Sequence, residues 1–144
     1  LIEQGKYQNL FHNSKTASEL NMVNNCRAYR GTRGPLGTSA TNKIIVSSSS
    51  VPESQMHGTP FVEIFALQGV HSGADAVSGD FSFGASGILH EGDNTTPIKG
   101  FTVSGNFYAM LNHIDAFGDV QHASTGRSFF SPKIKFKNLH LSGS

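Results

Sequence analysis

Alternation of apolar and polar side chains along the chain predicts a fold built mainly from β-strands. In residues 77–87, Val77, Phe81 and Phe83 alternate with small or polar residues, which places the two phenylalanines on one face of a half-buried strand. Glycine recurs in the same stretch and marks a bulge or a close approach of a second backbone. Strands are expected over residues 7–11, 43–46, 61–67, 79–89, 97–103 and 133–141, with 43–46 buried.

Turn and capping residues divide these strands from one another. The turn sequence at residues 91–94, Glu-Gly-Asp-Asn, predicts that strands 79–89 and 97–103 form a hairpin. Ser14 is expected to cap a short helix over 15–20, and Asn106 a second helix that runs to about Ile114. Residues 24–41 are rich in Arg, Gly, Ser and Pro and are expected to form a long loop.

The elements together predict a mainly β (α+β) fold, an antiparallel barrel or sandwich-like domain with two short helices, and a single domain over residues 1–144. In the last strand Ile134 and Phe136 are expected to face the interior, and the three lysines between and beside them to form a solvated, edge-protecting face rather than a binding patch. Nine side chains are expected to be largely buried: Phe61, Ile64, Phe81, Phe83, Ile88, Phe101, Val103, Ile134 and Phe136.

Composition narrows the function classes. The net charge is +1 and charged residues make up 15% of the chain, which gives no electrostatic reason to expect direct nucleic-acid binding. A single cysteine rules out an internal disulfide framework. The sequence has no signal-peptide pattern and no long apolar run, so no membrane association is expected and the cytoplasm is the default location.

Motifs of hydrolytic chemistry are incomplete. His90-Glu91 begins a zinc-binding HExxH pattern, but Asn94 and Thr95 stand where the second histidine would be, and the sequence has no HExxH or HExxxH. The run 84–87, Gly-Ala-Ser-Gly, resembles a serine nucleophile elbow, but Ile88 replaces the last glycine and a strand follows instead of a helix. The arginines at 27, 30 and 33 are read as a solvated loop in preference to a contact with substrate carboxylates.

A glycine-rich turn carries the remaining cluster, His71, Asp75, Asp80 and Ser82, and defines a candidate peptide groove. An imidazole oriented by a carboxylate could act as a base or support another group. The alternative, which we prefer, is that these side chains bond to the backbone and shape the edge of a groove. An extended peptide could dock there by adding a strand.

Four landmarks appear in order over residues 59–144 and resemble the C-terminal domain of the TldD/PmbA family. They are a QGVHSGAD–VSGDFSFGASG core over 68–87, an EGDNTTPIKGFTVSGN hairpin over 91–106, a short helix, and a closing SPKIKFKNLHLSG over 131–143. Residues 25–30 are similar to a further, less specific region of the family. Members are described as modulators of DNA gyrase and understood as two-subunit zinc metalloproteases that act on unfolded peptides.

The resemblance implies which subunit this is. The catalytic TldD-type subunit has its HExxxH helix upstream and a cysteine ligand in the stretch that here is 118–127, which contains no cysteine; Cys26 lies elsewhere. A non-catalytic PmbA/TldE-type subunit is therefore favoured, with no cofactor in this chain. His122 is the one side chain of that stretch that could replace the cysteine as a metal ligand, although a solvated loop histidine is the commoner case.

The same resemblance sets the expected context. Zinc is expected in a catalytic partner, and the chain in a homo- or hetero-dimer with a TldD-like subunit, where it walls the chamber that receives unfolded peptide. The intact protein is expected to be about three times longer, because the chain begins mid-domain, and the cut surface to expose apolar patches. The alternatives are a β-rich interaction domain without proteolytic context, or a catalytic TldD-type subunit whose metal motif is lost by truncation.

Overall fold

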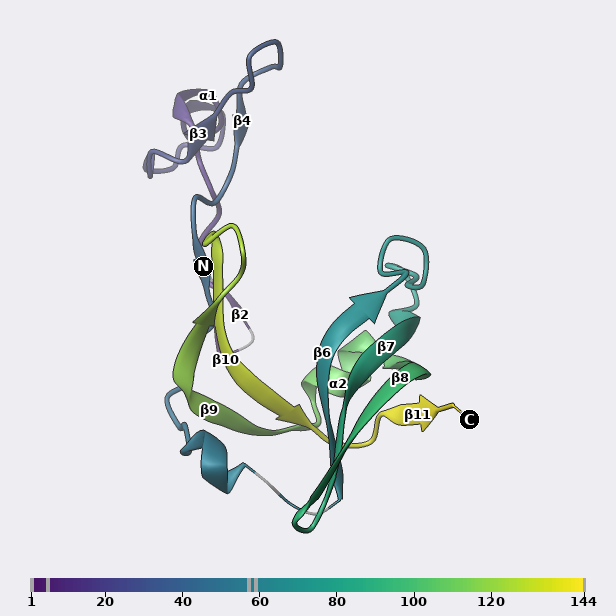
Figure 1. Cartoon of the computed structure of the whole chain (residues 1–144). Coiled ribbons are helices and arrows are strands. Elements are labelled where there is room, and N and C mark those ends of the chain that lie inside the picture. Colours follow the sequence, from purple (N-terminus) through teal and green to yellow (C-terminus); the bar gives the residue numbers. More distant parts are fainter. Residues whose placement is uncertain (1, 5, 57, 59, 144) are drawn as a thin grey trace. The chain divides into compact units, whose positions relative to one another are not determined.

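The computed structural model describes residues 2–4, 6–56, 58 and 60–143, and within them the fold is mainly β with two short α-helices, as expected (Figure 1). The described sheets do not close into a barrel. The chain divides into two compact units, residues 1–44 with 123–130 and residues 45–122 with 131–144. The elements are β1 Ile2–Glu3, β2 Lys6–Tyr7, α1 Ser14–Glu19, β3 Ala28–Tyr29, β4 Gly37–Thr38, β5 Lys43–Ile44, the 3-10 helix η1 Glu53–Gln55, β6 Phe61–Gln68, β7 Asp80–Glu91, β8 Asn94–Asn106, α2 Phe107–Leu111, β9 Ile114–Ala123, β10 Phe129–Phe136 and β11 His140–Ser142.

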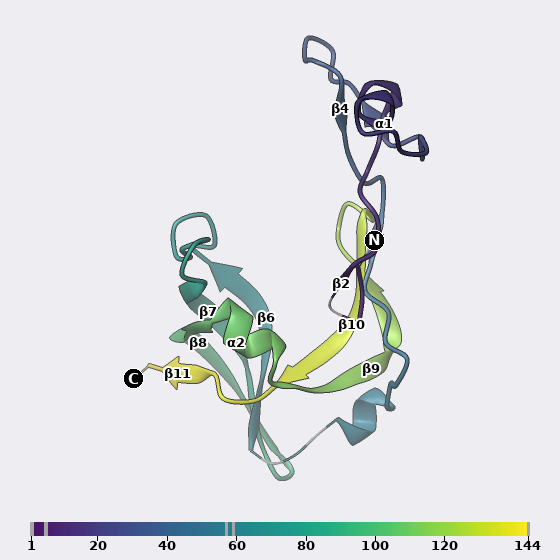
Figure 2. The same ribbon diagram turned by 180° about the vertical axis from the view of Figure 1, so that it is seen from behind.

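The main sheet of the second unit is antiparallel, in the order β11-β8-β7-β6. The predicted hairpin is confirmed and is longer than expected, since β7 and β8 pair from Asp80 opposite Asn106 down to Glu91 opposite Asn94. Register shifts interrupt β6 between Ile64 and Ala66, and the β7–β8 pair at 85–86. Figures 1 and 2 show α2 lying across one face of this sheet.

The core of this unit is small. Ala85, Phe101 and Val103 are buried, and Val62, Phe81, Phe83, Ile98 and Leu139 pack against them while remaining partly exposed. Of the nine side chains expected to be largely buried, only Phe101 and Val103 are; Ile64 is 36% exposed and the others are half-buried. The physical reason is that a helix of five residues is too short to cover a sheet whose strands reach 13 residues.

The predicted strand over 133–141 is two strands. Strand β10 ends at Phe136, and Asn138 has a positive φ of 62°, which turns the chain so that β11 can pair with β8. Helix α2 is shorter than expected because Ile114 already begins β9. Strand β9 also extends through the stretch expected as a loop, so His122 lies on a strand.

Segment 45–56 runs beside β9 in the second unit. The Val51 N–H donates to the Phe117 carbonyl at 2.9 Å, and the Gln121 side chain donates to the Ile45 carbonyl at 2.9 Å. These bonds place η1 next to β9, and the Glu53 N–H donates to Asp119 at 3.3 Å. Within the described residues, no helix is long and apolar enough to cross a membrane.

The first unit is built from short pieces. Asn13, not Ser14, caps α1: its side chain accepts from the Thr16 N–H in a capping box, and both residue types are good caps. The expected loop over 24–41 contains the pair β3–β4, and the strand expected over 7–11 is confined to β2. Strand β5 covers two residues, and Ile44 is 60% exposed where burial was expected, because β5 pairs in parallel with only the first two residues of β10.

Candidate functional site

A groove of about 1560 Å³ in the second unit is lined by both apolar and charged side chains. Residues 60–67 line it without a break, as do residues 133–139. Side chains of a strand alternate between its two faces, so an unbroken run of lining residues means that the strand presents its edge. Strand β6 is the outermost strand of its sheet, and β10 pairs with β5 only at Phe129 and Phe130.

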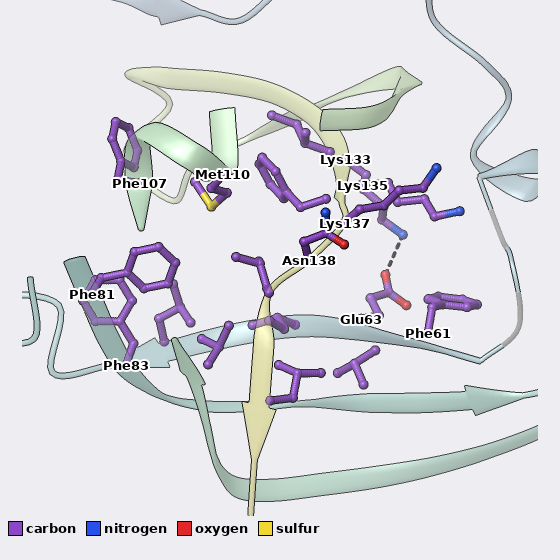
Figure 3. A pocket seen from close by; sticks show the side chains of 18 of the residues that line it. Phe61, Glu63, Phe81, Phe83, Phe107, Met110, Lys133, Lys135, Lys137 and Asn138 are labelled. Atoms are coloured by element: carbon purple, nitrogen blue, oxygen red, sulfur yellow. Dashed lines mark ion pairs between the residues drawn. The ribbon is translucent and has the colours of Figure 1, made fainter. Parts of the chain in front are cut away.

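One end of the groove is apolar. The rings of Phe81 and Phe83 are stacked with centroids 5.1 Å apart, and Phe107 and Met110 of α2 face them (Figure 3). The hydrogen bonds that Asn106 makes at the start of α2 hold these side chains in place, since its side chain accepts from the N–H groups of Tyr108 and Ala109. This end can take up the apolar side chains of a ligand.

The other end of the groove is ionic. Lys133 Nζ donates to Glu63 at 2.7 Å and lies 3.3 Å from Glu53, while His122 Nε2 lies 2.5 Å from the second oxygen of Glu53. The hydrogen bond from His122 lowers the pKa of Glu53, with Lys133 acting in the same direction, and the hydrogen bond from Lys133 lowers the pKa of Glu63. Glu63 in turn raises the pKa of Lys133.

Lys133 and Lys135 of β10, and Lys137 just beyond its end, are therefore paired with carboxylates as well as facing solvent. Lys135 and Lys137 both pair with Asp115 of β9, at 3.2 and 2.5 Å, and they lower the pKa of that carboxyl, Lys137 more than Lys135. Lys133 and Lys137 are exposed, as expected for a solvated face, but the ion pairs were not expected, because the carboxylates come from residues far away in the sequence.

Of the residues predicted for the peptide groove, His71 and Asp75 precede β7, and Asp80 and Ser82 lie at its start. Asp75 accepts from the N–H groups of Val77 and Ser78 at 2.7 and 3.1 Å, bonds that lower its pKa in that order. Asp80 accepts from the Asn106 side chain at 2.8 Å, and the Ser82 N–H donates to the Gly73 carbonyl. Asp75, Asp80 and Ser82 line a second, shallow hollow, and Asp75 also lines the main groove.

His71 is not brought to these carboxylates. Its side chain is exposed, lines neither hollow, and makes no hydrogen bond or ion pair within the described part of the chain. The preferred interpretation, in which His71 and Asp80 bond to the backbone, does not hold for these two residues. His71 has no such bond in the described part of the chain, and the Asp80 carboxylate accepts from the Asn106 side chain, whereas the backbone bonds go to Asp75. Sequence reasoning missed Glu53 and Glu63 and considered His90 only as the start of a zinc motif, because no local pattern relates these residues to Lys133.

The zinc that the family resemblance implies does not fit the side chains described. His122 and Glu53 are adjacent, but the Lys133 ammonium lies beside the same carboxylate and repels a cation. No group of three His, Cys, Asp or Glu side chains in the described residues could hold a metal ion. Ser86 lies inside β7 opposite Lys99, and so does not stand at a nucleophile elbow.

The chain matches a known class of protein domain. Residues 1–143 match the family described as the PmbA/TldA metallopeptidase C-terminal domain, and the chain belongs to that family. This confirms the resemblance to TldD/PmbA proteins seen in the sequence.

One solved relative has been described as a "putative modulator of a DNA gyrase" from Thermotoga maritima. The two structures superpose with a TM-score of 0.66 at 26% identity, over 98% of this chain and 32% of that chain. This chain therefore spans about a third of the length of the solved protein that it matches. No curated protein matches the chain.

Proposed function

We propose that this domain belongs to a PmbA/TldE-like, non-catalytic subunit and that its groove receives an extended segment of an unfolded peptide. The observation that carries the proposal is the pair of strand edges, β6 and β10, that line one groove. An extended peptide can pair its N–H and C=O groups with such an edge without any sequence requirement, and its side chains then fill neighbouring pockets.

The two ends of the groove give this peptide a preference. Phe81, Phe83 and Phe107 offer apolar contact area at one end, where a bound peptide would place an apolar side chain. Asp75 lines the main groove, and Asp80 and Ser82 line the second, shallow hollow at the start of β7, so we keep these three residues as the proposed groove edge and leave out His71, which lines neither hollow.

The subunit type rests on the chemistry of β9. In the stretch 118–127 a catalytic subunit of this family is expected to carry a cysteine ligand, whereas here the stretch has His122 engaged with Glu53. Zinc and the cleavage step are therefore assigned to a TldD-like partner, with which this subunit forms a homo- or hetero-dimer in the cytoplasm and walls the peptide chamber. Exposed apolar side chains such as Phe65 and Val77 provide contact area for such a partner.

The proposed peptide binding is tested with two variants of helix α2. Phe107 and Leu111 are each 47% exposed, but only Phe107 lines the groove. We expect Phe107→Ala to weaken binding of a fluorescent, unfolded casein peptide about tenfold, the loss of roughly 1.4 kcal/mol of apolar contact, and Leu111→Ala to leave it unchanged. Equal binding by both variants and the parent would contradict the proposal.

The subunit assignment has its own test. The untagged chain should release no peptide fragments with or without added zinc, and should support cleavage when a TldD-like subunit is added. Zinc-dependent cleavage by the chain alone would show the catalytic alternative to be correct. Peptide binding without any association with a TldD-like subunit would favour the plain interaction domain.

A further inference from the structure

One ion pair in the second unit joins the two walls of the groove. Lys133 belongs to β10, and its ammonium donates at 2.7 Å to Glu63, which belongs to β6 (Figure 3). Each strand presents its edge to the groove, so the length of this pair is tied to the distance between those edges.

Glu63 and Lys133 each have further contacts on their own side of the groove. Glu63 also lies 3.4 Å from His90 of β7, whose ring stacks on Phe61 at a centroid distance of 4.3 Å. On the other side Lys133 contacts Glu53, which is fixed by His122 and by the hydrogen bond from its own N–H to Asp119. A pair whose ends cannot move freely constrains the elements that carry it.

The neighbouring lysines do not have this position. Lys135 and Lys137 pair with Asp115 on β9, the strand beside β10, so their ion pairs stay on one side of the groove. Of the three lysines, Lys133 is the one that crosses to β6. Glu63 is half-buried, with 24% of its side chain exposed, while Lys133 is 47% exposed, so salt in the solvent can still screen the crossing pair.

We propose that Lys133 and Glu63 form an ionic latch that sets the width of the groove and so controls how readily an extended chain enters between β6 and β10. The control of entry rests on the proposed peptide-binding function, whereas the effect on width does not. With the latch closed, the two edges are held at one spacing. With the latch broken, the walls are joined there by no ion pair between described residues and can separate.

Distances between spin labels on the two sheets that carry the walls test the latch without any peptide. Thr96 of β8 and Val120 of β9 are exposed and line no groove, and Cys26 is replaced by serine so that only Thr96→Cys and Val120→Cys are labelled. In this background we expect Lys133→Met and Glu63→Gln each to broaden the distance distribution and shift it to longer values. Lys137→Met, the matched control, should leave the distribution unchanged.

Salt provides a test that does not depend on the folding of a variant. Raising the ionic strength from about 0.01 to 1 M shortens the Debye length from roughly 30 to 3 Å and so weakens the ion pair. The label distances of the parent should then shift in the same direction as those caused by Lys133→Met. The label distances of Lys133→Met should change less with salt. Distributions that coincide for the parent, Lys133→Met and Glu63→Gln would overturn the latch.

Peptide association then separates the two proposals. If the latch controls entry, the unfolded casein peptide associates faster with Lys133→Met than with Lys137→Met. A shift in label distance with no change in the association rate would overturn the control of entry. If the parent itself does not bind the casein peptide, the proposed function is overturned, while the effect of the latch on the label distance still stands.

Discussion

Strand β7 contains two glycines that look equivalent in the sequence and have different surroundings. A Cβ built on Gly87 would lie 2.1 Å from the Glu63 carbonyl oxygen, whereas one built on Gly84 would meet nothing closer than a side-chain carbon of Gln68 at 3.5 Å. Alternation predicted the strand and suggested a close approach of a second backbone. It could not tell which glycine is required, because the neighbour is a backbone on another strand.

The two glycines therefore predict opposite outcomes for the same substitution. Gly87→Ala should lower the free energy of unfolding by about 1–3 kcal/mol, because β6 must move away to admit a methyl group. Gly84→Ala should be neutral or slightly stabilising, because alanine restricts the unfolded chain. Urea unfolding of both variants measures the difference, and similar losses in the two would contradict the close approach at Gly87.

At the scale of elements, most of the long strands were predictable, but β9, although it spans ten residues, was expected as the end of a helix followed by a loop. Strands β6, β7 and β8 span eight or more residues, enough for alternation to emerge above chance, whereas β1–β5 have two residues each and carry no period. The ionic end of the groove was invisible for a related reason. Glu53 and His122 are 69 positions apart, and only the folded sheet brings them together.

Asn106 both caps α2 and contacts Asp80, and two substitutions at this residue can separate these roles. Asn106 accepts from two N–H groups of the helix and donates to the Ser78 carbonyl and to Asp80. Asn106→Ala should lower the free energy of unfolding by about 1–2 kcal/mol, the usual value of a lost cap. Asn106→Asp keeps the acceptor but sets a second carboxylate against Asp80.

The aspartate variant should therefore depend on pH where the alanine variant does not. Its loss of stability should be larger at neutral pH than in mild acid, where one of the two carboxylates becomes protonated. Parallel urea titrations at the two pH values provide the measurement. A loss for Asn106→Asp that is the same at both would show that the contact with Asp80 contributes nothing.

For the whole molecule, ionisable side chains tie distant elements together and make stability depend on pH. The pKa values of Glu53 and Glu63 lie below their ordinary 4.5, and that of Asp115 below 3.8, so the unfolded chain takes up protons first. Their contribution is present above those ordinary values and is lost as the pH falls through the lower folded values. The contribution of Lys133, whose pKa is raised above 10.5, is lost only as the pH rises through its folded value.

Removing the Lys133 ammonium should change how the free energy of unfolding depends on pH, on both the acid and the alkaline side. In Lys133→Met the pKa values of Glu63 and Glu53 move back towards 4.5, so the free energy of unfolding should fall less steeply on acidification and lose its decline above pH 10.5. Asp75 and Asp115 keep their own partners and preserve part of the decrease on acidification. Measuring the free energy of unfolding of parent and Lys133→Met across the pH range tests this prediction. The same decrease on acidification in both proteins would contradict it.

The parallel pairing of β5 with β10 has a consequence for synthesis on the ribosome. It joins Lys43 to Phe129, so the first unit cannot complete its sheet until synthesis has reached Phe129. At 5–20 residues per second the wait is on the order of 5–15 s. During that interval Leu20, Met22 and Val23, which remain exposed even in the folded protein, are available to chaperones, while the hairpin β7–β8 has already closed through its short turn.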